Sequence, residues 1–125
     1  MTTPRRLLAD EPSPRRARLD GVTTEVVDRP ERHRFEVLAD GTVAGYADYQ
    51  LSPGEILFTH TEIDEAYEGK GLGSVLVRHA LDDARERGLA VLPMCPFVRG
   101  WIGKHEDYLD LVPASSRAKY KLPAA

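Results

Sequence analysis

Residues 67–74, read as YEGKGLGS, constrain the fold of this chain more than any other stretch. They stand between a run of alternating apolar residues and a run with helical periodicity, which predicts a strand-to-helix junction. Gly69, Gly71 and Gly73 leave the backbone free of Cβ atoms where the first turn of a helix exposes its unpaired N–H groups. Such a junction is suited to bind phosphate, because the donors point outward and the helix dipole adds positive potential.

The glycine spacing alone does not decide between several kinds of site, because it also occurs in dinucleotide-binding folds, P-loops and plain tight turns. A Walker P-loop is excluded, since the chain lacks the spacer that precedes Gly-Lys-Ser/Thr in that motif. A dinucleotide-binding fold requires a further parallel βαβ unit with an acidic residue. Too little chain follows residue 93 to supply one.

Length and composition predict one domain. A chain of 125 residues with 42% hydrophobic content can bury a core without metals or disulfides. The net charge of −3 argues against a chain built for nucleic acid or an anionic membrane. The single cysteine, Cys95, excludes an internal disulfide and fits a reducing compartment. Because neither a membrane-spanning run nor a secretory signal is found, we expect a cytoplasmic protein.

Both ends of the chain are predicted to be loose. Residues 1–20 combine arginines and prolines with few large apolar groups, which is typical of a flexible tail. A basic docking arm is the alternative for this segment. Residues 114–125 are predicted to form a second loose tail, which leaves residues 21–113 as the folded domain.

An antiparallel meander is predicted in the first half of the domain. β-Branched residues and period-two alternation indicate strands over residues 22–28, 33–39, 42–51 and 55–63. The turn sequences Asp40-Gly41 and Ser52-Pro53-Gly54 connect the last three of these strands. Simple alternation in the last strand places one set of side chains on a single face: Ile56, Phe58, His60 and Glu62.

After the glycine loop the period changes to 3.6 residues, which predicts a helix over residues 71–87. Its apolar stripe comprises Leu72, Leu76, Val77, Ala80, Leu81 and Ala84. Gly88 ends the helix, and the apolar run 89–92 predicts a strand parallel to strand 55–63. Pro96 can begin a second short helix, and residues 108–112 form a last short element.

This order of elements, with its x-x-G-x-G loop, resembles the GNAT superfamily of acyl-CoA N-acyltransferases. More narrowly, four segments resemble a small, minimal acetyltransferase-like subgroup: HTEI at 60–63, EGKGLGS at 68–74, PMCPFV at 93–98 and WIGKHEDYLDLV at 101–112. The resemblance covers about residues 24–113. It implies a mixed α+β fold and an acetyl-CoA cosubstrate.

The resemblance also implies which residues bind the cofactor. The backbone amides of the loop would bind the CoA pyrophosphate, from Gly69, Lys70, Gly71, Leu72, Gly73 and Ser74. Ile63 would pair with the pantetheine amides, and Cys95 would lie near the thioester, with Pro96 and Phe97 beside it. The chain departs from the family at Glu68, where Gln or Arg is common. A carboxylate there is unfavourable beside a diphosphate unless it turns away.

Three residues are candidates for the chemistry. Transfer of an acetyl group to an amine needs a base for the amine and a proton donor for the departing thiolate. Glu62 or His60 could be the base; the alternatives are a solvated edge carboxylate and a hydrogen-bonded histidine without a catalytic role. Cys95 could be a nucleophile, a proton donor or a small hydrophobe. The histidines and the cysteine lack metal-ligand spacing, so no metal is expected.

The favoured function is an acetyl-CoA-dependent N-acetyltransferase acting on a small amine or on a protein or peptide amine. The alternative is a CoA-binding module with a regulatory or partner-binding role and no turnover. A nucleic-acid-binding protein that uses the arginines of residues 1–20 is a third reading, which the acidic remainder weakens. The acceptor is not indicated by the sequence, and an acceptor site completed by a homodimer is left open.

Overall fold

The computed structural model of the chain describes residues 15–19 and 22–122. Within these residues, strands form a single sheet in the order β1-β2-β3-β4-β5-β6. The strands are β1 (Arg15–Leu19), β2 (Val22–Arg29), β3 (Arg34–Ala39), β4 (Thr42–Ser52), β5 (Glu55–Ile63) and β6 (Ala90–Pro93). Neighbours from β1 to β5 pair antiparallel, and β5 pairs with β6 in parallel. The predicted mixed α+β fold, with its meander and parallel last strand, is confirmed.

The two turn sequences form the expected hairpins. Asp40 and Gly41 both have positive φ angles, 48° and 86°, as a two-residue hairpin loop requires. Gly54 follows Pro53 with a φ of 77°, which a turn of this kind reserves for glycine.

Two irregularities in the sheet change which side chains share a face. The register skips Ala44 in β4 and Thr59 in β5, so each strand carries a bulge. Phe58 pairs with Tyr49 toward the core, whereas His60 pairs with Asp48. The prediction that Phe58 and His60 share a face is therefore wrong, because the extra residue reverses the alternation between them.

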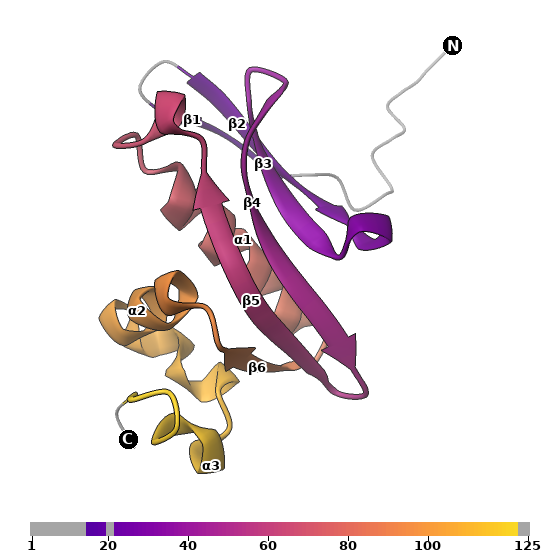
Figure 1. Cartoon of the computed structure of the whole chain (residues 1–125), viewed down its shortest axis with the longest axis vertical. Helices are drawn as coiled ribbons and strands as arrows, with labels where there is room; N and C mark the ends of the chain where they lie inside the picture. The colour runs from indigo at the N-terminus through magenta and orange to yellow at the C-terminus, as the bar shows by residue number, and fades with distance from the viewer. Residues whose placement is uncertain (1–14, 20–21, 123–125) are drawn as a thin grey trace.

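The helices lie mainly on one side of the sheet (Figure 1). They are α1 (Leu72–Glu86), α2 (Pro96–Lys104) and α3 (Ala114–Arg117), with 3₁₀ turns η1 (Pro30–Arg32), η2 (Glu65–Tyr67) and η3 (Glu106–Leu111). The predicted apolar stripe of α1 is buried in full, and the helix packs against β2, β3, β4, β5 and β6. Gly88 ends α1 with a φ of 69°, as predicted. Figure 1 shows no helix over the near face of β4 and the upper part of β5.

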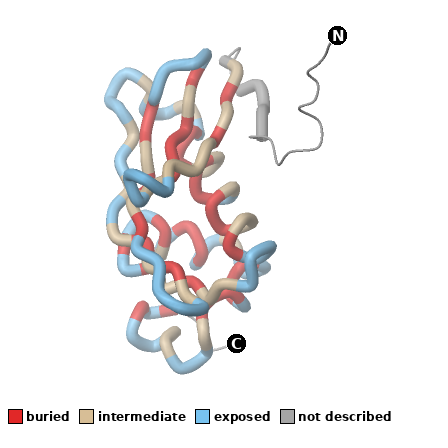
Figure 2. Tube along the Cα trace, turned by 90° about the vertical axis from the view of Figure 1, so that its right-hand side faces the viewer, coloured by how far each residue is buried: buried red, intermediate tan, exposed pale blue. Residues whose placement is uncertain are grey.

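The core lies between the sheet and α1, where Figure 2 shows the buried stretches of both. Phe35, Tyr49 and Phe58 contribute its aromatic rings, with centroids 5.3 Å apart for Phe35 and Tyr49 and 6.5 Å apart for Tyr49 and Phe58. On the other face, the carboxylate of Glu36 is also buried. Its oxygens lie 3.1 Å from Arg29 Nε and 2.9 Å from Arg34 Nη2, so its charge is compensated where it lies.

The predictions for the two ends of the chain need correction. Residues 15–19 form β1 on the outer edge of β2, although they were assigned to a flexible tail; residues 1–14 lie outside the described part. Strand pairing satisfies backbone groups, which a composition argument does not detect. Residues 114–122 are not loose either. Tyr120 and Leu122 are buried, and Leu122 Cδ2 lies 3.9 Å from the position of a Cβ on Gly103 of α2.

This packing predicts that Leu122→Ala destabilises the fold. The substitution removes buried methyl groups against α2, so we expect a loss of about 2 kcal/mol in the free energy of unfolding, measured by urea denaturation. Ser115→Ala changes an exposed side chain of the same segment and should stay within about 0.5 kcal/mol of the parent chain. Equal stability of the Leu122 variant and the parent would show that the segment is loose after all.

Candidate active site

A cleft opens where β5 and β6 stop pairing. The last residues in register are Phe58 and Pro93, and the hydrogen bond from Cys95 N to Phe58 O, 2.9 Å long, closes the ladder. Beyond this hydrogen bond β5 continues to Ile63, while the segment after β6 turns away and forms α2. The resulting cleft has a volume of about 460 Å³ and is lined by Thr61, Ile63, Tyr67, Glu68, Gly69, Gly71, Leu72, Gly73, Ser74 and Phe97.

One wall of the cleft is an unpaired strand edge. Asp64 N donates to Ala44 O in β4 over 2.7 Å, so the alternation of an antiparallel ladder directs the backbone groups of Thr61 and Ile63 to the opposite side. Among the described residues, no strand pairs with them there, because β6 ends at Pro93. An extended ligand with amide groups could therefore add to this edge as a further strand.

The second wall is the N-terminus of α1. Gly71 caps the helix in the left-handed conformation, with a φ of 80°, and no side chain in residues 22–122 caps the first turn. Within the described part of the chain, none of the N–H groups of residues 69–74 donates to another group of the protein. These groups and the positive end of the helix dipole give this part of the cleft the chemistry that suits an anion.

Glycines keep this wall open. Gly69 has a φ of 82° with nothing within 4 Å of a Cβ position, whereas a Cβ on Gly73 would lie 2.7 Å from Phe97 Cζ. The ring of Phe97 therefore rests on the helix backbone at Gly73 and is 45% exposed at the cleft. A side chain at position 73 would push this ring away.

Two residues with hydroxyl groups, Thr61 and Ser74, line the cleft, and each hydroxyl accepts a hydrogen bond from a buried side chain. Trp101 Nε1 donates to Ser74 Oγ over 2.9 Å, and Cys95 Sγ donates to Thr61 Oγ1 over 3.3 Å. Cys95 and Trp101 are both buried, and both belong to α2 or its N-cap. The start and the middle of one helix thus reach the two walls of the cleft.

On the uncovered face of β5, Glu62 and His60 form a polar pair. Glu62 Oε1 lies 3.0 Å from His60 Nε2 and accepts a hydrogen bond of 2.9 Å from the hydroxyl of Tyr46. The hydrogen bonds from His60 and Tyr46 lower the pKa of Glu62, and the same contact raises the pKa of Tyr46. Glu62 is therefore an anion at neutral pH, in contact with the His60 imidazole and the Tyr46 hydroxyl.

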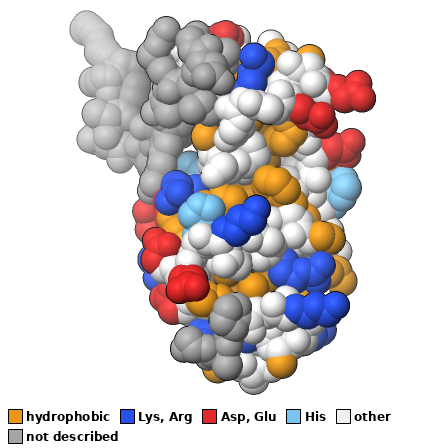
Figure 3. Space-filling view, turned by 90° about the vertical axis from the view of Figure 1, so that its left-hand side faces the viewer, with side chains coloured by type: hydrophobic (Ala, Val, Ile, Leu, Met, Phe, Trp, Pro, Cys, Tyr) orange, Lys and Arg blue, Asp and Glu red, His pale blue; other side chains and the backbone are white. Residues whose placement is uncertain are grey.

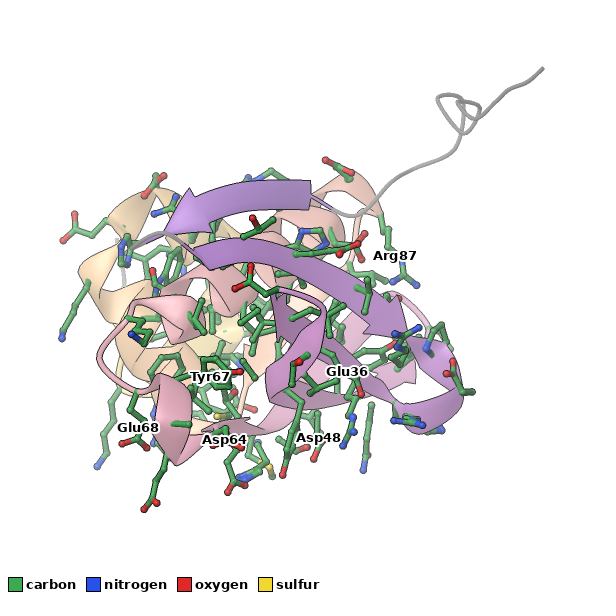
Figure 4. All side chains as sticks on the ribbon, turned by 90° about the horizontal axis from the view of Figure 1, so that it is seen from above. Glu36, Asp48, Asp64, Tyr67, Glu68 and Arg87 are labelled. Atoms are coloured by element: carbon green, nitrogen blue, oxygen red, sulfur yellow. The ribbon has the colours of Figure 1, made fainter. Side chains whose placement is uncertain are left out.

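The sequence prediction of the cofactor site agrees with the lining of the cleft in most positions. Ile63, Gly69, Gly71, Leu72, Gly73, Ser74 and Phe97 line it. Lys70, Cys95 and Pro96 do not, although Cys95 reaches the lining through Thr61. Thr61 and Tyr67 were missed; alternation with Ile63 could have indicated Thr61. Glu68 also lines the cleft, but Figure 4 shows its side chain at the outer edge of the molecule, while Tyr67 points inward.

The described residues contain no group of three or more His, Cys, Asp and Glu side chains placed to hold a metal ion. No helix in this part of the chain has the length and apolar content to cross a bilayer. Figure 3 shows acidic side chains and a histidine along the margin that corresponds to the near face of Figure 1. The exposed acids of β5 and of the turn that follows it include Glu62, Asp64 and Glu65.

Comparison with known proteins agrees with this geometry. The sequence profile described as GCN5-related N-acetyl-transferase matches residues 34–111, which is more than half of the chain. The chain belongs to this family. The match runs from β3 through the cleft to η3. GCN5-related N-acetyltransferases use acetyl-CoA as a cosubstrate, which fits the backbone donors and the open strand edge found here.

Two individual N-acetyltransferases are similar to about half of this chain. The streptothricin acetyltransferase of Streptomyces lavendulae is 44% identical over 71 residues, which is 55% of this chain and 36% of that protein. The ribosomal protein bS18-alanine N-acetyltransferase of Escherichia coli K12 is 31% identical over 58 residues, 46% of this chain and 39% of that protein. The matches thus cover less than two-fifths of the length of either relative.

The pair on the uncovered face predicts a titration experiment. Tyr46→Phe removes one of the two hydrogen bonds that lower the pKa of Glu62, so this pKa should rise toward the ordinary carboxyl value. The single variant His60→Ala should raise the pKa of Glu62 more than Tyr46→Phe does, because the hydrogen bond from His60 has the larger effect on this pKa. Carboxyl carbon NMR titration measures both changes. Tyr120→Phe, on the C-terminal segment, is the control and should leave Glu62 unchanged; an unmoved pKa in all variants would contradict the contacts.

Proposed function

We propose that this chain is an N-acetyltransferase that moves the acetyl group of acetyl-CoA to an amine. The observation that carries the proposal is the row of free backbone donors at the start of α1, directly beside the unpaired edge of β5. Family membership and the acetyltransferase relatives support it.

The cofactor would occupy both walls of the cleft. The N–H groups of residues 69–74 would bind the diphosphate, while the pantetheine amides would pair with Thr61 and Ile63. The thioester would then lie where β5 and β6 diverge, near Cys95. Glu68 is exposed, so its carboxylate can stay in water rather than face the diphosphate.

The acyl transfer would proceed by direct attack. The amine nitrogen forms a bond to the thioester carbonyl carbon, the C–S bond breaks, and the thiolate of CoA takes up a proton. His60 would accept the proton that the amine loses, with Glu62 holding the imidazole and stabilising its charged form, as carboxylate–histidine pairs do in other enzymes. The exposed acids nearby would attract a cationic amine.

Cys95 fits the role of proton donor better than that of nucleophile. Its thiol is buried and donates to the hydroxyl of Thr61, a group that does not activate it as a base would. The hydrogen bond from the thiol leads to the cleft, because its acceptor, Thr61, lines the cleft. We therefore propose that Thr61 gives its hydroxyl proton to the CoA thiolate and takes the thiol proton of Cys95 in its place. The Cys95 thiolate left behind would regain a proton from water in the cleft, through Thr61, once CoA has left.

A CoA-binding module without turnover would use the same two walls. Calorimetry with CoA tests binding, and release of free thiol from acetyl-CoA in the presence of an amine panel tests turnover. Binding together with amine-dependent thiol release is expected. Binding without thiol release would favour the module, and no binding at millimolar CoA would exclude both. The cytoplasmic location and the homodimer stay predictions.

Gly69→Ala should weaken CoA binding by about ten-fold or more, because alanine disfavours the positive φ that aims the loop amides at the diphosphate. Gly41→Ala is the matched control, since Gly41 also has a positive φ and open space at its Cβ position but lies in a remote hairpin. Both variants should lose about 1 kcal/mol of stability. Equal CoA affinity in the two variants, measured by calorimetry, would contradict the proposed diphosphate site.

Substitution of Cys95 tests its role. Cys95→Ala removes the donor to Thr61 and should lower kcat by about 100-fold, whereas Cys95→Ser keeps a donor and should retain most of the rate. Val98→Ala, a buried truncation on the same helix, controls for packing loss. If both Cys95→Ala and Cys95→Ser react no faster than the uncatalysed reaction, Cys95 is instead a nucleophile. A parental kcat in Cys95→Ala would indicate a structural residue.

A further inference from the structure

The hydrogen bond between Trp101 and Ser74 has a defined direction. An indole N–H can only donate, whereas a serine hydroxyl has one donor and two acceptor positions. Ser74 Oγ therefore accepts from Trp101 Nε1 at 2.9 Å. The proton of the Ser74 hydroxyl is left for a different acceptor.

The position of Ser74 indicates where that proton can go. Ser74 lies in the first turn of α1 and lines the cleft, beside the free N–H groups of residues 69–74. A serine in a helix often donates back to a carbonyl of the preceding turn. Within the described residues, the Ser74 hydroxyl makes no hydrogen bond other than the one from Trp101. An anion in the cleft is thus available as its acceptor.

Trp101 is held firmly in the orientation that this contact needs. Its ring is 6% exposed and stacks on His105 at a centroid distance of 3.7 Å, with the planes 11° apart. Tyr108 packs edge-on at 5.0 Å, and the guanidinium carbon of Arg78 lies 5.1 Å from the indole centroid. The hydroxyl of Tyr108 donates to Asp82, which ties η3 to α1.

We infer that Trp101 is a positioning residue for the cofactor: its indole N–H occupies an acceptor site of the Ser74 hydroxyl and turns the hydroxyl proton toward the diphosphate of CoA. This inference rests on the proposed CoA site. It adds a side-chain donor to the backbone donors and makes the affinity for the diphosphate depend on α2. If the hydrogen bond to Ser74 served only to satisfy the buried indole N–H, Trp101 would not affect the affinity for the diphosphate.

Binding measurements with two ligands separate these roles. Trp101→Phe keeps an aromatic ring but removes the donor, so the Kd for CoA should rise by about three- to ten-fold, as expected for the loss of one ordinary hydrogen bond. The Kd for pantetheine, which lacks the diphosphate, should not change. Ser74→Ala should have a similar effect on CoA, and the double variant should bind CoA no more weakly than Ser74→Ala alone. Tyr120→Phe removes a hydroxyl of the C-terminal segment, outside this cluster, and should leave both affinities within two-fold.

The chain has one tryptophan, so its indole N–H gives a single assignable NMR signal. Titration of the parent chain with CoA should shift this signal, titration with pantetheine should not, and Ser74→Ala should abolish the shift. This readout decides the question even if Trp101→Phe does not fold.

Two results would overturn the inference while the proposed CoA site stands: a parent chain that binds CoA without a shift of the indole signal, or additive losses in Trp101→Phe and Ser74→Ala. A parent chain that binds no CoA would refute the proposed function itself. The two failures are therefore distinguishable by the binding of CoA to the parent chain.

Discussion

The hydrogen bond from Cys95 N to Phe58 O marks the point on which the site depends, because it is where two parallel strands stop pairing. Had β6 continued beside β5, its backbone would have filled the edge at Thr61 and Ile63. Pro96, which begins α2, helps to turn the chain away instead. The unpaired edge and the first turn of α1 then face one cleft, and both present backbone groups that no other described residue binds.

The surrounding elements hold this cleft open and supply its side chains. α2 contributes Phe97 to the lining and reaches Thr61 and Ser74 through Cys95 and Trp101. The bulge at Thr59 is equally important, since it sends His60 and Glu62 to the uncovered face while Thr61 stays on the cleft side. A one-residue irregularity thus separates the proposed cofactor side of β5 from its proposed acceptor side.

Much of this arrangement follows from the sequence. Period-two and period-3.6 patterns, with Gly41, Gly54 and Gly88 at their boundaries, predict the strands and α1, and the glycine loop predicts the donor row. The bulge at Thr59 could not be predicted, because nothing in the alternation around it differs from a regular strand. Nor could the packing of Leu122, since it depends on a surface formed by residues distant in the sequence. The pairing of β1 is local instead: Leu19 pairs with Val22 across the sequence Asp20-Gly21, a hairpin signal that the composition of residues 1–20 does not reveal. The contact of Trp101 with Ser74 joins two helices, and sequence spacing carries no signal for it.

Amide hydrogen exchange at residues 69–74, followed by NMR with and without CoA, would show whether these backbone donors bind the cofactor. We expect rapid exchange of these N–H groups in the free chain, because no acceptor within the described residues binds them, and marked slowing when CoA is bound. Exchange that is already slow in the free chain, or that CoA leaves unchanged, would contradict the claim that these backbone donors bind the diphosphate.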